Sequence, residues 1–184
     1  MKRTIILTSA GMLAAISIVF QVFHIGYQSP WGMWIDLVAI PWILAYFLFG
    51  FRGSLITAAV SSIIIALVAP SGLVGASMKL IATLPMFFVP ALIVYLSKLE
   101  IKDIEKTRWF VTVLISSVIV RGLFVIPANY YFAIPVFFGM SPKQAMEFVP
   151  PLVMFGLNAI QGLIDFAIAW MLAFRFKLTR FGTI

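Results

Sequence analysis

Six long apolar runs dominate this chain and limit what it can fold into. They cover roughly residues 5–25, 33–50, 53–69, 74–97, 108–134 and 149–174. A helix of about 20 apolar residues crosses the hydrocarbon layer of a bilayer, and helices satisfy their own backbone polar groups there. The sequence is 63% hydrophobic and only 10% charged, far from the composition of soluble domains. We therefore predict an all-α, polytopic integral membrane protein in which residues 1–184 form a single domain of six transmembrane helices.

The lysines and arginines predict the orientation of these helices. Ten of the thirteen basic residues flank the runs at one alternating set of ends: Lys2, Arg3, Arg52, Lys98, Lys102, Lys106, Arg108, Arg175, Lys177 and Arg180. The connections at the opposite ends contain only Lys143. Because cytoplasmic loops carry the excess of basic residues, this asymmetry predicts that both termini are cytoplasmic, an N-in, C-in topology.

Most catalytic and metal chemistry is excluded by residue type. The chain has no cysteine and a single histidine, His24, which rules out disulfides, thiolate catalysis and multi-histidine metal sites. It also lacks a Walker A motif, a dinucleotide fingerprint and an H-E-x-x-H motif. We expect no metal, no cofactor and no enzymatic activity, and the chain cannot drive transport by its own ATP hydrolysis.

The last run carries three polar side chains on one helix face. Asn158, Gln161 and Asp165 are spaced i, i+3 and i+7, which places them within about 60° of one another. Polar residues inside a membrane normally face the bundle interior or a wet cavity. Two interpretations are open: one wall of a polar pocket, or a hydrogen-bonded seam between helices. Asp165 lies nearer the cytoplasmic side and suits an internal pair or the cytoplasmic interface.

Polar residues of four runs fall at a similar depth in the outer half of the membrane. These candidate ligand-binding residues are Asp36, Lys79, Arg121, Asn129, Asn158 and Gln161. Arg121 lies about 20 Å from Arg108, past the middle of a ~30 Å hydrocarbon layer, so it needs a partner, for which Asp36 is a candidate, or a ligand. Lys79 can snorkel outward or point into the pocket. Amides, a few charges and many aromatic rings suit a flat polar heterocycle.

Two further features concern the first run and the connection that follows it. Ala10 and Ala14 are four residues apart and present a face of small residues, which lets another helix approach closely. That face either packs within the chain or docks onto a partner subunit. The connection from residue 24 to residue 35 is rich in glycine, proline, tryptophan and tyrosine, and it is either an aromatic anchor or a lid over an outward-facing pocket.

Several short motifs occur in an order that is typical of one family. They are Ala10-x-x-x-Ala14, Asp36-Leu-Val-Ala-Ile-Pro41, Phe47-Leu-Phe-Gly50, Asn129-Tyr-Tyr-Phe-Ala-Ile-Pro135 and Asn158-Ala-Ile-Gln-Gly162. They resemble an alanine motif, D-F-S-D-I-P, F-x-F-G, N-Y-F-x-x-x-P and N-x-x-K-G. Over most of its length the chain is similar to the substrate-binding S component of energy-coupling factor (ECF) vitamin transporters, most closely to the riboflavin-binding RibU group.

The resemblance implies a function and partners. An S component of this kind binds its vitamin, here riboflavin, from outside the cell with high affinity. It lies in the plasma membrane of a prokaryote and docks through the alanine motif, Ala10 and Ala14 here, onto a membrane coupling subunit (EcfT) that carries two ATPase subunits. ATP hydrolysis on those partners topples the S component in the bilayer and releases the vitamin inside.

The chain also departs from the riboflavin group's pattern. Gln161 stands where the group has a lysine, Ala39 replaces the second acid, and Lys79 falls within a segment that reads G-E-L-A-N in the group. These changes leave open an S component for a different vitamin or heterocycle. Two other classes are a small intramembrane enzyme that uses Asp165 or Asp36, and a structural subunit whose polar face only holds helices together.

Overall fold

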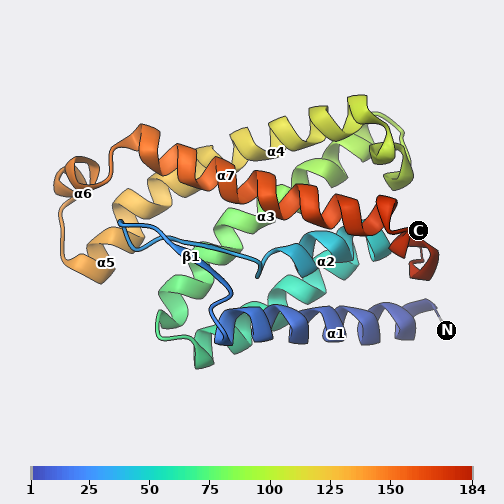
Figure 1. The fold of residues 1–184 in the computed structure, drawn as a ribbon, viewed down its shortest axis with the longest axis horizontal. Helices are drawn as coiled ribbons and strands as arrows, with labels where there is room; N and C mark the ends of the chain where they lie inside the picture. The colour runs from blue at the N-terminus through green and yellow to red at the C-terminus, as the bar shows by residue number, and fades with distance from the viewer. Residues whose placement is uncertain (1, 184) are drawn as a thin grey trace.

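The apolar runs fold as long helices that lie along one common direction (Figure 1). The computed structural model describes residues 2–183. Its long helices are α1 (Lys2–Val22), α2 (Ile40–Val68), α3 (Gly72–Leu96), α4 (Thr107–Ala128) and α7 (Pro151–Trp170). Shorter elements connect or extend them: β1 (Gly26–Gln28), β2 (Trp34–Asp36), η1 (Ile101–Glu105), η2 (Asn129–Ala133), α5 (Ile134–Phe138), α6 (Pro142–Phe148), η3 (Met171–Arg175) and η4 (Leu178–Phe181).

Five helical segments within the described residues are long and apolar enough to cross a membrane. They are Arg3–Val22, Ile40–Val68, Gly72–Leu96, Thr107–Phe138 and Pro151–Arg175. The prediction of an all-α polytopic membrane protein is confirmed, apart from one hairpin of two three-residue strands. Two predicted spans, residues 33–50 and 53–69, correspond to the single element α2, so the path of that element decides how often the chain traverses the bundle.

Helix α2 reverses direction at Gly50 and forms a hairpin with two arms. Gly50 has φ 74° and ψ −171°, a backbone conformation that is open almost only to glycine. The Ser54 hydroxyl donates a hydrogen bond of 2.6 Å to the Trp42 carbonyl oxygen. In a straight helix these residues would be about 18 Å apart along the axis, so the arms lie antiparallel. The short reversing connection predicted between the second and third runs therefore exists, and the chain traverses the bundle six times (Figure 1).

The first seven residues of the predicted second span, 33–39, are not helical, which corrects that prediction. Strand β2 pairs antiparallel with β1, Gly26 opposite Asp36, and helix α2 begins only at Ile40. Glycine at position 26 permits this pairing, because a Cβ atom there would lie 2.2 Å from the Ile35 carbonyl oxygen. Pro41 occupies the first turn of α2, where its missing N–H costs no hydrogen bond. The hairpin thus occupies part of the bundle that a longer helix would otherwise fill.

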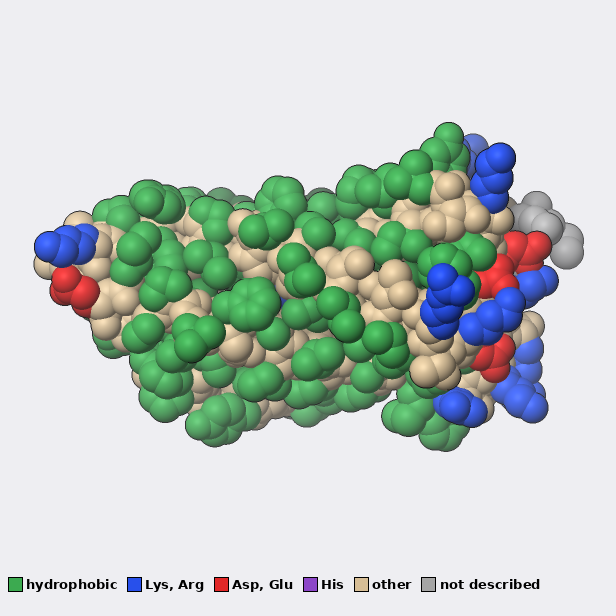
Figure 2. All heavy atoms as spheres, turned by 90° about the horizontal axis from the view of Figure 1, so that it is seen from above, with side chains coloured by type: hydrophobic (Ala, Val, Ile, Leu, Met, Phe, Trp, Pro, Cys, Tyr) green, Lys and Arg blue, Asp and Glu red, His purple; other side chains and the backbone are tan. Residues whose placement is uncertain are grey.

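The two ends of the bundle differ in charge. Both termini lie at the same end (Figure 1), and basic and acidic side chains gather there, whereas the flank of the molecule is almost continuously hydrophobic (Figure 2). This end contains the ion pairs Lys102–Glu100 and Lys106–Asp103. The apolar flank is the surface expected to face lipid, and exposed large side chains such as Leu123 and Leu152 belong to it.

A core of aromatic rings fills the half of the bundle nearer the charged end. Trp42, Tyr46 and Phe47 of the first arm of α2 are fully buried, and the Phe47 ring contacts the Phe166 ring of α7 edge-on at 5.4 Å between centroids. Such pairs contribute about 0.5–1.5 kcal/mol beyond the area they bury. This packed core leaves the polar residues of the same helices to face one another in the other half.

Replacing Gly50 with alanine is expected to destabilise the protein by about 1–3 kcal/mol, because a Cβ atom disfavours its φ and ψ. Space is not the cause, since the nearest atom to that Cβ would be the Ile101 Cδ1 atom at 3.8 Å. Gly156→Ala is the matched control: Gly156 is inside α7, and a methyl group at that position would have nothing within 4 Å. It should be neutral or stabilise by up to about 1 kcal/mol. Thermal unfolding in detergent measures both; equal midpoints would contradict the role of Gly50.

Candidate ligand-binding site

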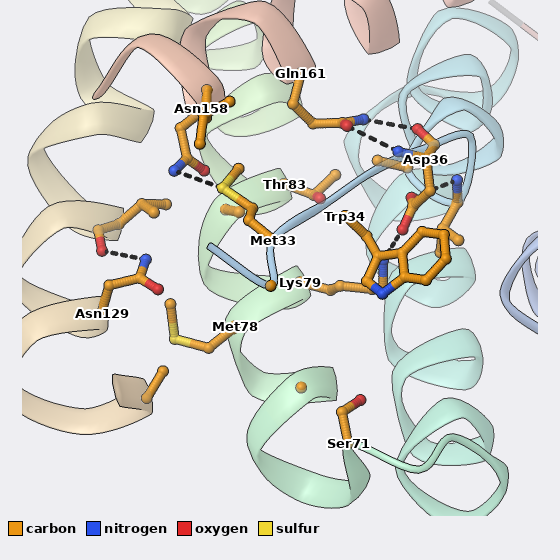
Figure 3. Close-up of a pocket in the computed structure, with 18 of the residues that line it drawn as sticks. Met33, Trp34, Asp36, Ser71, Met78, Lys79, Thr83, Asn129, Asn158 and Gln161 are labelled. Atoms are coloured by element: carbon orange, nitrogen blue, oxygen red, sulfur yellow. Dashed lines mark hydrogen bonds and ion pairs between the residues drawn. The ribbon is translucent and has the colours of Figure 1, made fainter. Parts of the chain in front are cut away.

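A cavity of about 520 Å³ lies between the β1–β2 hairpin, the first arm of α2, and helices α3, α4 and α7. Small-molecule sites in proteins typically measure about 300–1,000 Å³. All the candidate residues of the sequence analysis line it: Asp36, Lys79, Arg121, Asn129, Asn158 and Gln161, together with Asp165. Figure 3 shows five of them around one space. The structure brings these residues together; that they bind a ligand stays a prediction.

Asp36 at the end of β2 is held by Lys79 of α3. The Lys79 Nζ atom forms an ion pair with Asp36 Oδ2, and Asp36 Oδ1 accepts a 3.0 Å hydrogen bond from the Val38 N–H (Figure 3). Of the two alternatives for Lys79, the side chain points into the cavity. The pair ties the hairpin to α3 across the cavity.

Gln161 holds the same strand end from the opposite side. Its Oε1 atom accepts from the Asp36 N–H at 2.9 Å, and its Nε2 atom donates to the Asp36 carbonyl oxygen at 2.7 Å. Nε2 also donates to Asp165 Oδ1 at 2.7 Å. The amide therefore holds the β2 backbone at Asp36 through two hydrogen bonds, one accepted and one donated. Because these bonds use both ends of the amide, Gln161 positions the wall of the cavity.

Arg121 finds its ionic partner in Asp165 and not in Asp36. The Arg121 Nη1 atom lies 3.8 Å from Asp165 Oδ2, and both side chains are almost fully buried. Arg121 Nη2 donates to Asn158 Oδ1 at 3.4 Å. The internal-pair alternative for Asp165 is therefore the one observed. Asp165, Gln161, Arg121 and Asn158 form one polar network in the wall of the cavity, in a region where unpaired charges are costly.

The two asparagines keep different hydrogen-bonding capacity. Asn158 is nearly saturated: its Nδ2 atom donates to the Met154 carbonyl oxygen at 2.9 Å and lies 3.6 Å from the sulfur atoms of Met33 and Met154. Thioether sulfur is a weak acceptor, so a ligand oxygen would be a better partner than Met33. Asn129 donates to the Val125 carbonyl oxygen at 2.9 Å, and its side-chain oxygen accepts no hydrogen bond from the described residues (Figure 3).

Comparison with known proteins identifies the family. A family model described as "ECF transporter, substrate-specific component" matches residues 6–176. The chain belongs to this family. It is thus a membrane component that takes a small-molecule substrate and works with the partner subunits of an ECF transporter.

A solved structure has the same fold as this substrate-specific component. It is described as "Structure and mechanism of the S component of a bacterial ECF transporter" and aligns with a TM-score of 0.73 over 95% of this chain and 96% of that chain. The two chains are 24% identical, which supports a shared fold alone. No curated protein matches the chain.

The sequence analysis offered the tryptophan-rich segment that contains Trp34 as a lid, but it did not single out Met33, Met78 or Thr83. The structure of this substrate-specific component places these three side chains in the lining of the cavity as well (Figure 3). The clustered glycines, proline and tryptophans after the first run signalled an irregular segment but not its path. Trp31 also lines the cavity, which favours the lid interpretation over a purely interfacial anchor.

The structure shows where Ala10 and Ala14 lie, while docking of a partner subunit on α1 stays a prediction. Both residues have 0% exposed surface, because their face of α1 packs on the second arm of α2. The Thr57 hydroxyl lies 3.3 Å from the Ala10 carbonyl oxygen, as expected for helices in close contact. The small residues therefore serve packing within the chain. Gly11 and Ala15, one position further, present the same spacing on the exposed side of α1.

Proposed function

We propose that this substrate-specific component binds a flat, uncharged heterocycle, with riboflavin as the leading candidate, and delivers it to the cytoplasm with a coupling subunit and ATPases. The observation that carries the proposal is the charge balance of the cavity. Its four charged residues form two internal pairs, Lys79 with Asp36 and Arg121 with Asp165. A ligand with its own net charge would have to break one of these pairs or remain uncompensated, and both are costly in a membrane.

The uncharged part of the cavity wall supports a planar ring system. Trp31, Trp34 and Phe138 supply aromatic surface, and the Asn129 side-chain oxygen is free to accept a hydrogen bond. Aromatic faces pack against flat rings, while a few placed polar groups fix orientation. Riboflavin has an apolar tricyclic ring with a donor and acceptor edge and carries no charge at neutral pH.

The departures from the riboflavin group bear on the exact ligand. Gln161 replaces a lysine, and its amide clamps the Asp36 backbone. Lys79 supplies a cation from a different helix, but that cation is paired with Asp36. The cavity therefore has no unpaired cation in place of the riboflavin group's lysine, which favours a neutral ligand. Another uncharged heterocyclic vitamin is the second candidate.

The direction of transport follows from the charge asymmetry of the bundle. We assign the charged end to the cytoplasm, because basic loops remain inside. The cavity is lined by the turn at Pro70 and Ser71 and by Phe138, which belong to the opposite end. The ligand therefore enters from outside. The energy for release comes from the partner ATPases.

Calorimetry with purified protein tests the proposal. Riboflavin is expected to bind with micromolar or tighter affinity and one ligand per chain, whereas flavin mononucleotide, with the same ring and a charged phosphate, is expected to bind at least tenfold more weakly. Asn129→Ala should weaken riboflavin binding about tenfold, the equivalent of one lost hydrogen bond of ~1.4 kcal/mol. Gln144→Ala, an amide outside the cavity, is the control. No heat with riboflavin, and no flavin in mass spectra of the purified protein, would remove riboflavin as the ligand.

A further inference from the structure

A second hollow lies at the charged end of the bundle, away from the ligand cavity. It is a shallow groove, open to the surface, between α2 at Tyr46 and Phe51, the end of α3 and η1. Its lining is apolar at Phe51, Val94 and Ile101, with Tyr95 and Lys98 exposed at its edge. The transport function described above does not use this groove.

The groove contains one buried polar atom without a partner. Tyr46 lines it and is 1% exposed, and its hydroxyl oxygen has no hydrogen-bond partner among the described residues. An unsatisfied hydroxyl in an apolar setting costs free energy, so a group that is missing from the isolated chain is expected to bind it.

Lys98 provides the matching charge. It follows the last turn of α3 in a left-handed conformation with φ 52°, and the Leu99 N–H donates to the Val94 carbonyl oxygen at 3.0 Å to close the turn. The ammonium group takes part in none of the ion pairs of residues 3–183, unlike Lys102 and Lys106 nearby, which pair with Glu100 and Asp103. A groove lined by an uncompensated cation and by a tyrosine with a free hydroxyl is suited to an oxyanion.

An apolar stripe on α3 leads from the groove toward the middle of the bundle. Phe88, Leu92, Tyr95 and Leu96 share one helix face and are between 43% and 80% exposed. The Phe88 ring lies 6.1 Å from the ring of Phe51, which lines the groove, so stripe and groove are continuous. A ligand that fits both has a long apolar tail and an anionic head at the interface.

We propose that this groove is a binding site for an anionic phospholipid, with the phosphate at Lys98 and Tyr46 and an acyl chain along the α3 stripe. The cationic end of the bundle supports this occupant, since a basic residue near an anionic lipid surface contributes about 1 kcal/mol. Bound lipid fills the space between the α2 reversal and α3 and so stabilises the fold. The proposal is independent of which substrate the cavity binds.

The test compares two lipids with the same acyl chains, palmitoyl-oleoyl phosphatidylglycerol and phosphatidylcholine, added to purified protein in detergent. Phosphatidylglycerol is expected to raise the unfolding midpoint more and to be retained preferentially in native mass spectra. Lys98→Gln should lower its apparent affinity about fivefold, the equivalent of ~1 kcal/mol. Lys143→Gln, at the opposite end, should leave that affinity unchanged.

Tyr46→Phe separates lipid binding from simple packing. The substitution keeps the aromatic ring and removes the unsatisfied hydroxyl. The unfolding midpoint without lipid should therefore be unchanged or higher, while the increase in the midpoint that phosphatidylglycerol causes should become smaller. Tyr131→Phe, an exposed tyrosine at the other end, is the control. Three results would overturn the proposal. The two lipids could raise the unfolding midpoint equally, Lys98→Gln or Tyr46→Phe could keep the full increase, or glycerol phosphate alone could give the same increase.

Discussion

Asp165→Ala is expected to destabilise the protein by about 3–5 kcal/mol, a larger loss than we predict for any other single substitution. The reason is the position of Arg121, which is 3% exposed and has Asp165 as its ionic partner. Without Asp165 the guanidinium group would remain buried and uncompensated, and Gln161 would lose one of its acceptors. The unfolding midpoint in detergent measures the loss, and it should exceed that of Gly50→Ala.

A double variant distinguishes the lost ion pair from lost packing. Arg121→Met with Asp165→Leu removes both charges at similar volume and should recover most of the stability, because a buried pair is often no better than well-packed apolar residues. Lys106→Ala is the matched exposed control, since Lys106 pairs with Asp103 at the surface and its loss should change the midpoint little. A double variant as unstable as Asp165→Ala would contradict this account.

The helices of this protein follow from its sequence, whereas the partners of its buried charges do not. Run length and hydropathy fix the number of crossings, because a membrane admits few alternatives. Depth along a helix places Arg121 and Asp36 near one level and suggests that they pair. Depth does not determine which neighbouring helix a side chain faces. In the structure Arg121 of α4 faces α7 and pairs with Asp165. Lys79 can be assigned to Asp36 only from the path of the hairpin, which reaches α3.

The irregular hairpin is the other limit of prediction. Residues 33–39 are as apolar as a helix, so hydropathy includes them in a span. Their extended form is set by tertiary contacts: pairing with β1, the close approach at Gly26, and the Gln161 clamp on Asp36. Tertiary contacts routinely override local propensity. Sequence patterns consequently place Trp34 in a segment that is either an anchor or a lid, and they miss Met33, which this segment also brings to the cavity.

Helix α1 shows a third limit, because two small-residue pairs with the same spacing lie side by side in its sequence. Ala10 and Ala14 form one, and Gly11 and Ala15 the other. Spacing cannot tell which pair faces the chain's own helices. In the structure the first pair is buried on α2, and a Cβ atom at Gly11 would have nothing within 4 Å. Of the two pairs, only Gly11 and Ala15 are exposed, and we propose that a coupling subunit docks on their face.

Gly11→Trp and Ala15→Trp are expected to reduce substrate uptake at least tenfold and leave ligand binding by the purified protein unchanged. Small residues let two helices approach closely in lipid, and an indole ring on that face would hold a partner helix away. A loss of ~1.4 kcal/mol in docking already gives a tenfold effect. Met12→Trp, on an exposed part of α1 beside this face, is the control for bulk in the lipid-facing surface.

A different result is expected for the buried pair. Ala10→Trp and Ala14→Trp would push α1 away from the second arm of α2, where both side chains have no exposed surface. They should lower the unfolding midpoint and ligand binding together, whereas the Gly11 and Ala15 variants should lower uptake alone. Uptake measured in cells with the partner subunits, beside binding and unfolding measured on the purified chain, separates these outcomes. Normal uptake with tryptophan at both exposed positions would mean that the coupling subunit docks on a different face.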